Sequence, residues 1–493
     1  MKFWYRPLKI QLIIPPSGYI AQRWKEGSSM PALGILYVAA VLEKNGHQVT
    51  VTAADARKLR IGDILKEVAA TKADIVGITI TTENRFETFD LARQIKIGFP
   101  DKLLVIGGPH ATMAGSDMIS HIPEIDIAVI GEGEETMLEL VRWREAGADA
   151  AELKKIKGII FRLEGRPYFS GPRPPIPDLD PLPFPAKHLV PMERYDFRWP
   201  VNGRQLPVAN LMSARGCPFN CNFCATPITW GRRVRGYSPQ RVLAEIRWNR
   251  ERFGAEYIWF FDDTFNYNPQ RTEELCDLLI REKVGISFTA EVRPDALNYE
   301  LLARMREAGA HYISFGIEAG SERVRQEIIH KYIPSERIFQ LLDWTQKLGI
   351  TTTAFFIFSH PTETWLEAQE TLAIMERIRQ RSDISVSVLH IYPGTELETI
   401  ARQQGLLPED FSWSRRDHRV ATLPAAQGDV PLFIDRFSWW QIGELIVKWS
   451  VGSRKTSLFR KIPDLLKSIR SLKDLSHYVI FGLVYLRIKL FGR

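Results

Sequence analysis

Apolar runs that alternate with helical patterns determine what this 493-residue chain can fold into. Strands separated by helices form a parallel sheet that is covered on both faces. The first 150 residues contain five runs of strand character, namely Lys9–Pro16, Gln48–Asp55, Asp74–Thr82, Lys102–Thr112 and Asp126–Thr136. Helical patterns lie between them, for example at Pro31–Gly46. We therefore predict, for residues 1–150, a doubly wound, Rossmann-like α/β domain whose ligand lies beyond the C-terminal ends of the strands.

A second alternating series spans residues 205–400. Its six strand-like runs are Leu206–Cys217, Tyr257–Phe265, Ile286–Asp295, His311–Ser321, Thr351–Thr364 and Ile384–Leu397. Six strand–helix units are too few for a closed eight-fold barrel, so we predict a partial (β/α)6 barrel that is open on one side. Residues 151–204 are predicted to be a linker, because Gly171–His188 is dense in proline. Residues 401–493 have a weaker pattern and are predicted to form a mostly helical C-terminal region.

Composition and charge narrow the class of protein. Four cysteines are too few for a disulfide framework in a chain of this length, which indicates a reducing compartment. There is no signal-peptide pattern and no run of 18 uncharged apolar residues, so we expect a cytoplasmic location. Residues 454–493 carry ten Lys or Arg and two Asp, a net charge of +8, whereas the whole chain has +7. Because the body of the chain is therefore close to neutral, we expect no nucleic-acid partner.

Three of the four cysteines lie within eight positions, at Cys217, Cys221 and Cys224. A structural zinc site needs four protein ligands, and the remaining cysteine, Cys276, lies on a helix face that is predicted to be buried. Three thiolates on one short loop suit a four-iron cluster whose fourth iron stays open to another ligand. A zinc knuckle completed by a histidine is the alternative, although no histidine lies nearby in the sequence.

The stretch "CPFNCNFC", directly after a predicted strand, resembles the signature of the radical S-adenosylmethionine (SAM) superfamily. The resemblance implies that Cys217, Cys221 and Cys224 bind a 4Fe–4S cluster and that SAM binds the open iron. It also implies that an electron donor such as flavodoxin or ferredoxin drives the cleavage of SAM to a 5′-deoxyadenosyl radical.

Further motifs of the second domain resemble SAM-contacting segments of the same superfamily. The resemblance places Asp262 and Asp263 of "FFDDTFN" near the methionine amino group, with helix capping as the alternative role for both. Arg293 of "AEVRPD" would hold the methionine carboxylate in a bidentate pair. The SAM-binding candidates are Phe223, Asp262, Asp263, Glu291, Arg293, Glu318, Ser321 and Tyr392. The segment "FFIFSHPTET" receives no role, because Phe358 and Thr362 stand where the superfamily has glycines.

The first domain, placed before such a barrel, resembles that of the cobalamin-dependent radical SAM enzymes. The cobalamin-binding candidates are Thr81, Gly107, Gly108, His110, Gly131, Glu132 and Gly133. Glycines at strand ends let a cofactor approach the backbone, although plain strand-to-helix turns also need them. Glu132 is expected to bond a nucleotide hydroxyl. No Asp-x-His-x-x-Gly motif is present, so we expect cobalamin without a histidine of this chain below the cobalt.

The resemblance favours a C-methyltransferase that acts on an unactivated carbon of a hydrophobic, lipid-like or tetrapyrrole-like substrate. No single residue is assigned as catalytic. A radical SAM cyclase or oxidoreductase without methyl transfer is one alternative, and a cobalamin-binding sensor or carrier is another. Methylthiotransferases resemble this domain order too, but they need three more cysteines for a second cluster.

The basic C-terminal tail has the pattern of an interfacial helix. Its apolar residues recur at steps of three or four, at Leu458, Ile462, Leu465, Ile469 and Leu472, with Lys and Arg between them. We expect this tail to associate with the anionic inner face of a membrane. The alternative is a C-terminal helix that packs on the barrel and keeps its charges in water.

Overall fold

The computed structural model describes residues 8–16, 30–423, 428–452 and 472–491. The chain forms two compact units. The first is made of Met1–Cys217, Thr226–Phe261 and Ser412–Arg416, and the second of Pro218–Ala225, Asp262–Phe411 and Asp417–Arg493. Each unit therefore contains segments that are far apart in the sequence, and the cysteine loop contributes to both.

The first sheet confirms the predicted parallel core. Its strand order is β2-β1-β3-β4-β5-β6-β7, and β1 to β5 are parallel neighbours. The strands are β1 (Lys9–Ile14), β2 (Gln48–Ala53), β3 (Ile75–Thr79), β4 (Leu103–Gly107), β5 (Ile127–Val129), β6 (Ile159–Leu163) and β7 (Arg166–Phe169). The chain places β2 on one side of β1 and β3 on the other, so the order of the strands reverses between β1 and β3. A doubly wound sheet binds its ligand at such a point.

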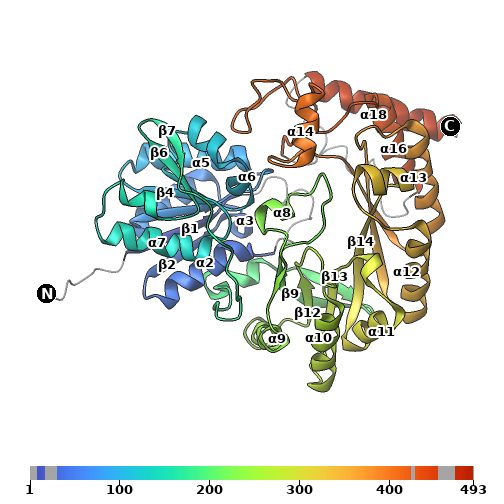
Figure 1. Ribbon diagram of the computed structural model, residues 1–493, viewed down its shortest axis with the longest axis horizontal. Coiled ribbons are helices and arrows are strands. Elements are labelled where there is room, and N and C mark those ends of the chain that lie inside the picture. The colour runs from blue at the N-terminus through green and yellow to red at the C-terminus, as the bar shows by residue number, and fades with distance from the viewer. Residues whose placement is uncertain (1–7, 17–29, 424–427, 453–471, 492–493) are drawn as a thin grey trace. The chain divides into compact units, whose positions relative to one another are not determined.

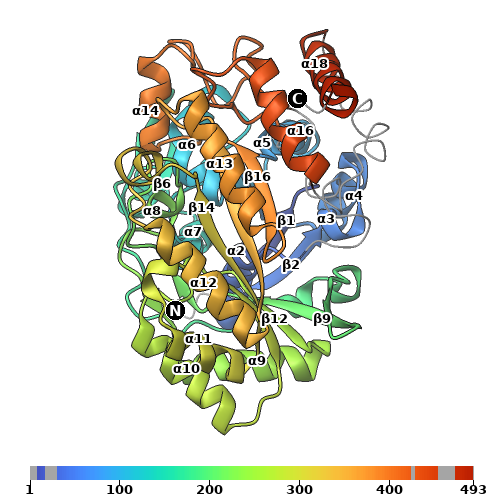
Figure 2. The same cartoon turned by 90° about the vertical axis from the view of Figure 1, so that its right-hand side faces the viewer.

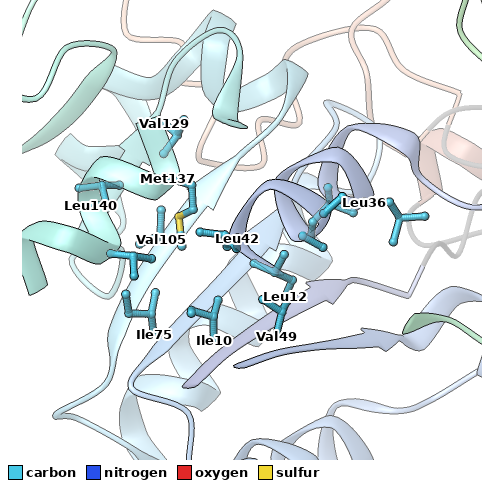
Figure 3. Close-up of a cluster of buried hydrophobic side chains, with 14 of the residues drawn as sticks. Ile10, Leu12, Leu36, Leu42, Val49, Ile75, Val105, Val129, Met137 and Leu140 are labelled. Carbon is cyan, nitrogen blue, oxygen red and sulfur yellow. The ribbon is translucent and has the colours of Figure 1, made fainter. Parts of the chain in front are cut away.

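Helices cover both faces of this sheet, because its strands are apolar on both sides (Figure 1). The helices are α2 (Leu33–Lys44), α3 (Ala54–Arg57), α4 (Ile61–Thr71), α5 (Arg85–Gly98), α6 (Pro109–His121) and α7 (Gly133–Glu145). Side chains of α2 and α7 form one core with Ile10, Leu12 and Val105 (Figure 3). Side chains of α4, α5 and α6 form the other core with Ile13, Val76 and Ile106.

The segment predicted as a linker contains regular structure, which corrects that part of the prediction. Strands β6 and β7 form an antiparallel hairpin that extends the first sheet past residue 150. Glu164 and Gly165 connect them with φ angles of 50° and 77°, as in the two-residue turns that suit the twist of a hairpin. The proline content of Gly171–His188 obscured this hairpin signal just before it. Short 3₁₀ turns follow at Lys187–Leu189 and Met192–Arg194.

The second sheet contains the six predicted strands and one more. Its order is β16-β15-β14-β13-β12-β9-β8, with parallel pairing for β9–β12 and along β13 to β16. The strands are β8 (Arg198–Val201), β9 (Arg204–Leu211), β12 (Tyr257–Phe260), β13 (Ser287–Glu291), β14 (Ala310–Glu318), β15 (Thr351–Phe358) and β16 (Asp383–Val388). The added strand, β8, pairs antiparallel with β9. The sheet has two edges, as expected for a partial barrel.

Helices between these strands complete the strand–helix repeat, and Figure 2 shows α12 and α13 among them. They are α9 (Pro239–Phe253), α10 (Pro269–Arg281), α11 (Tyr299–Ala308), α12 (Ser335–Leu348) and α13 (Trp365–Ile378). Polar side chains determine where several of these helices begin. Ser238, Asn268 and Asn298 each accept a hydrogen bond from the backbone three residues ahead, which satisfies one free N–H of the first helical turn.

The C-terminal region is helical where it is described, with α14 (Glu396–Gln403), α16 (Trp439–Gly452) and α18 (Leu472–Phe491). Helix α18 packs on α16 (Figure 1). Trp439 stacks on His477 with ring centroids 3.7 Å apart, and a side chain at Gly443 would meet Phe481 at 2.7 Å. Within the described residues, no helix has the length and apolar content needed to cross a membrane. The predicted stripe of Leu458, Ile462, Leu465 and Ile469 lies outside the described residues, and Leu472 begins α18.

Candidate active site

The cysteine loop is closed at its base by two short paired strands, β10 (Ala214–Arg215) and β11 (Arg235–Gly236). All three cysteines are half-buried and free of disulfides. The Cys217 N–H donates to the Gly231 carbonyl at 3.3 Å, and the Cys224 N–H donates to the Cys221 carbonyl at 3.1 Å. The thiols therefore stand, without a disulfide among them, on a loop that its own backbone contacts organise.

Charged side chains of the second unit surround Cys221. Burial raises the pKa of its thiol to about 11, and the Lys331 ammonium acts in the opposite direction. Glu318 and Arg293 also act on this thiol. The structure thus brings two predicted SAM-binding residues close to the cysteine loop, together with Lys331, which the sequence analysis missed.

Glu318 and Lys331 form a buried ion pair, with 2.7 Å between Oε1 and Nζ. Glu318 has a φ of 69°, a left-handed conformation that is unusual for a residue with a side chain. A side chain at Gly316 would lie 1.9 Å from Glu318 Oε1 and 2.5 Å from Lys331 Nζ. The glycine in "FGIEAG" therefore makes room for this pair. The lysine is 13 residues away in sequence, so no local motif could reveal it.

Arg293 makes a bidentate pair, but with a carboxylate of this chain. Its Nε and Nη2 donate to the two Asp295 oxygens at 3.0 and 2.9 Å. Its guanidinium carbon lies 3.5 Å from the centroid of the Phe219 ring, on the cysteine loop. Arg293 follows the last residue of β13, Glu291. A methionine carboxylate at this guanidinium would therefore share it with Asp295.

The acidic residues at the strand ends differ in their setting. Asp262 is buried, whereas Asp263 is exposed. Helix α10 is capped by Asn268, so neither aspartate has the capping role considered as an alternative for that helix. Glu291 is exposed at the end of β13, close to two other carboxylates. Desolvation there, with the Asp263 and Glu318 carboxylates, raises the pKa of Glu291 to about 7.

Ser321 and Tyr392 are engaged within the protein. The Ser321 hydroxyl donates to Glu367 at 3.0 Å, and Glu367 also accepts from Arg323. The Tyr392 carbonyl accepts from the Thr395 hydroxyl at 2.7 Å, at the start of α14. Phe223 packs beside a small apolar cluster that includes Ala319.

The turn after β15 is left-handed at two residues with side chains, Ser359 (φ 75°) and Thr362 (φ 60°). Of the two positions at which the superfamily has glycines, Thr362 lies in this left-handed turn, whereas Phe358 is the last residue of β15. Glu363 holds the turn by accepting from the N–H groups of Ser359 and His360 at 2.8 and 3.0 Å. Burial raises the pKa of Glu363 to about 7.

The predicted cobalamin-binding residues lie at the C-terminal ends of β3, β4 and β5, as the doubly wound fold requires. Thr81 donates its N–H to Asn84 at 2.8 Å. A side chain at Gly108, which has a φ of 111°, would meet the Ile80 carbonyl at 2.8 Å. Gly108 is therefore required by the protein's own chain, in line with the simpler explanation of these glycines.

His110 is fully buried at this edge. Its Nδ1 lies 3.1 Å from the Thr82 hydroxyl, and its Nε2 has no hydrogen-bond partner in the part of the chain that the structure describes. Desolvation lowers the pKa of His110 well below its ordinary value. Trp413 lies edge-on to the ring, and its carbonyl accepts from Arg85 at 3.0 Å.

Trp413 belongs to a short segment, Ser412–Arg416, that returns to the first unit from the C-terminal region. Ser414 anchors this segment, because its N–H and hydroxyl both donate to Asp117 of α6, at 2.9 and 2.7 Å. The segment thus completes the surroundings of His110.

Glu132 accepts four hydrogen bonds from three donor groups. Its oxygens accept from Arg215 at 2.9 Å, from Arg235 at 2.8 and 2.9 Å, and from the Ile176 N–H at 2.7 Å. A carboxylate offers about four acceptor positions. A nucleotide hydroxyl at Glu132 would therefore have to replace one of these donors.

Comparison with known proteins places this geometry in a family. The B12 binding domain model matches residues 25–141 and the radical SAM superfamily model matches residues 211–375. An uncharacterized methyltransferase of Pyrococcus horikoshii is 33% identical over 403 residues, which cover 81% of this chain and 84% of the relative. The chain belongs to the cobalamin-dependent radical SAM enzymes.

Other relatives of this family differ in their named reactions. The hopanoid C-3 methylase of Methylococcus capsulatus is 27% identical, with 88% of this chain and 79% of the relative covered. The anaerobic magnesium-protoporphyrin IX monomethyl ester cyclase of Rubrivivax gelatinosus is 29% identical, with 69% and 61% covered. The structure of the methyltransferase TsrM from Kitasatospora setae, with cobalamin and a 4Fe–4S cluster bound, has a TM-score of 0.71 at 16% identity and covers 97% of this chain and 99% of that one. The last likeness confirms the fold.

The residues present fit the cofactors of the family. Among the described residues, no group of three or more His, Cys, Asp or Glu side chains has the arrangement of a single-metal site. Three cysteines on one short loop suit a 4Fe–4S cluster whose fourth iron stays open to another ligand. For cobalamin, the unpartnered Nε2 of buried His110 is a polar atom that a ligand could satisfy. Cys276 is fully buried on α10.

Proposed function

We propose that this enzyme transfers a methyl group to an unactivated carbon of a hydrophobic small molecule. The observation that carries the proposal is one chain that combines a cobalamin-binding sheet edge with a three-cysteine loop on a partial barrel. The methylase and methyltransferase names of its relatives support the same reaction. When bound, the cluster and SAM supply a radical that removes a hydrogen atom, and cobalamin supplies the methyl group.

The chain's own residues bind and orient these groups. We assign the cluster to Cys217, Cys221 and Cys224. Lys331 fixes the Glu318 carboxylate, which we assign to the SAM ribose hydroxyls, and Arg293 presents a guanidinium beside the cysteine loop. The further SAM contacts that we propose are Phe223, Asp262, Asp263, Glu291, Ser321 and Tyr392. Thr81, Gly107, Gly108, His110, Gly131 and Gly133 are proposed for cobalamin.

The product mass tests the proposal. Reconstituted enzyme is incubated with SAM, cobalamin, a reductant such as reduced flavodoxin or ferredoxin, and an extract of small molecules. SAM labelled in its methyl group should transfer the label to a compound that gains one methyl. A product without the label that has lost hydrogen or gained oxygen would instead favour the cyclase or oxidoreductase alternative, which the protoporphyrin cyclase relative supports. Cobalamin binding without any deoxyadenosine formation would indicate a sensor or carrier.

A hydrophobic substrate agrees with a second proposal, that the C-terminal region associates with an anionic membrane surface on its cytoplasmic side. Helix α18 packs His477, Phe481 and Val484 towards α16, while a stripe of apolar residues stays in contact with solvent. The members of this stripe are Leu475 (40% exposed), Val479 (51%), Leu483 (52%) and Leu486 (50%). Their spacing of three or four residues places them on one face of the helix.

The basic residues 454–493 complement this stripe. Each Lys or Arg near an anionic surface contributes about 1 kcal/mol, and each half-exposed leucine that enters lipid contributes about 1 kcal/mol as well. The two contributions together favour an interfacial position for α18.

Cosedimentation with vesicles tests this second proposal. The full chain should pellet with vesicles of phosphatidylcholine and phosphatidylglycerol, less in high salt, and little with phosphatidylcholine alone. Changing Val479 and Leu483 to Ser should reduce pelleting at least fivefold. Leu366→Ser is the matched control, because Leu366 is a 71% exposed leucine on α13. Equal pelleting of both variants would contradict the proposal.

A further inference from the structure

Two arginines oppose each other where the cysteine loop begins and ends. Arg215 on β10 is paired in antiparallel register with Arg235 on β11, and Arg215 stands two residues before Cys217. Like charges directly opposite in a strand pair repel each other. Their side chains are only 1% and 6% exposed, so water screens this repulsion little. The loop can close only if another group compensates the two charges.

Glu132 is the group that meets both arginines. It comes from the loop between β5 and α7, at the sheet edge that faces the ligand of the first domain. Its carboxylate lies 2.9 Å from Arg215 Nη1 and 2.8 Å from Arg235 Nη1. Glu134, two residues later, accepts from Arg215 Nη2 at 2.7 Å. Glu132, directly before α7, and Glu134, in its first turn, thus neutralise both arginines at the base of the cysteine loop.

The backbone between Arg215 and Cys217 restricts where the first thiol can lie. Gly216 joins Arg215 to Cys217 with a φ of 102°, and a side chain there would meet the Arg233 carbonyl at 2.8 Å. The next N–H, that of Cys217, donates to the Gly231 carbonyl. A change in how Arg215 is held therefore moves Cys217.

We propose that Glu132 is a positioning residue for the iron–sulfur cluster and that it is not a ligand of the cobalamin nucleotide. Through Arg215 and Arg235 it makes closure of the cysteine loop depend on the folded cobalamin-binding domain. This role is independent of which molecule receives the methyl group.

Reductive cleavage of SAM to 5′-deoxyadenosine, which needs no second substrate, is the first readout. It is measured with titanium(III) citrate on the reconstituted full chain. The second readout is the change in the EPR signal of the reduced cluster when SAM is added, and the third is cobalamin affinity by absorbance. The variants are Glu132→Gln, Arg235→Gln and the two together. Asp126→Asn is the matched control, since Asp126 is a carboxylate of the same unit that pairs with Lys96 at 2.7 Å and precedes β5, at the end of that strand opposite to Glu132.

Glu132→Gln should lower SAM cleavage at least tenfold and alter the EPR change, with cobalamin affinity within twofold of the wild type. Adding Arg235→Gln should restore at least a third of the cleavage rate, because it removes one of the two repelling charges. The control should stay within twofold in all three measurements. If Glu132→Gln cannot be purified in a folded form, Arg235→Gln tests the proposal by itself. In this variant the change that SAM causes in the EPR signal of the reduced cluster should differ from that in the wild type.

Three results would overturn the proposal. The first is a loss of cobalamin affinity in Glu132→Gln with normal SAM cleavage, which would assign Glu132 to the nucleotide. The second is a double variant that cleaves SAM no better than Glu132→Gln, and the third is a normal EPR change in Arg235→Gln. Either of these two would show that repulsion between the arginines is not the cause.

Discussion

Cys221 and Cys276 differ in position rather than in the direction of their pKa shift, because burial raises the pKa of both thiols. Cys221 lies half-buried on the cysteine loop, whereas Cys276 is fully buried on α10, away from that loop in the sequence. We predict that Cys276→Ala keeps iron content and deoxyadenosine formation within twofold of the wild type, whereas Cys221→Ala loses both. Iron and sulfide analysis after reconstitution checks this. A loss of iron in Cys276→Ala would remove the assignment of the cluster to three cysteines.

At the residue scale, sequence motifs indicated which residues gather but not what they touch. Arg293 forms a bidentate pair, as its motif suggested, yet its partner is Asp295. Lys331 was missed because its pairing with Glu318 depends on the left-handed backbone at Glu318 and on Gly316. Contacts of this kind come from tertiary structure, so neither spacing nor residue type could predict them.

The turn after β15 adopts left-handed backbone conformations that its residue types disfavour. Thr362 is exposed and left-handed, and a β-branched residue pays about 1–2 kcal/mol for that conformation. Glycine adopts this conformation without that cost, but it also increases the entropy of the unfolded chain, which offsets part of the gain. We therefore predict that Thr362→Gly raises the free energy of unfolding by up to about 1 kcal/mol. Thermal melting measures it. Thr351→Gly, at the exposed start of the same strand, should lower the melting temperature.

Glu363 in the same turn gives stability a pH dependence. Its pKa is about 7 in the folded protein and 4.5 in the unfolded chain. Between pH 4.5 and pH 7 Glu363 is ionised in the unfolded chain but still protonated in the folded protein. The free energy of unfolding therefore falls as pH rises from 4.5 to 7, by at most about 3 kcal/mol. Glu363→Gln does not titrate. The melting temperature of Glu363→Gln minus that of the wild type should therefore be more positive at pH 8 than at pH 5.

Glu367 serves as the control for this titration. Its hydrogen bond with Arg323 lowers its pKa to about 2, so the carboxylate is ionised at both pH values. The difference between Glu367→Gln and the wild type should stay constant from pH 5 to pH 8. A constant difference for Glu363→Gln as well would show that Glu363 does not carry the dependence.

At the scale of elements, periodicity predicted the strands well and the connections poorly. The five parallel strands of the first sheet and six of the second sheet were predicted because each is an apolar run between helical patterns, and most of these runs are largely buried. The β6–β7 hairpin was missed because its turn residues, Glu164 and Gly165, stand beside a proline-rich stretch that obscured the alternation. Strand β8 is short and at an edge, where the apolar pattern is weakest.

For the whole molecule, cobalamin binding is the property that links fold to function. We predict a base-off absorbance spectrum for the bound cofactor, because no Asp-x-His-x-x-Gly motif offers a histidine ligand. Saturation at one hundred times the dissociation constant should stabilise the unit that binds it by about 2.7 kcal/mol. Absorbance and melting with and without cobalamin check both statements. A histidine-ligated spectrum, or an unchanged melting temperature, would contradict them.

The return of Ser412–Arg416 to the first unit has a consequence for how the protein is made. Domains tend to fold in order as they leave the ribosome, the N-terminal one first. Here the surroundings of His110 lack Trp413, and Asp117 lacks the donors of Ser414, until residues beyond 416 have emerged. The cofactor-binding unit is therefore finished only after the entire second sheet has been synthesised. A nascent chain that stalls before Ser412 should leave this edge open, so we expect the enzyme to take up cobalamin only once residues 412–416 have emerged from the ribosome.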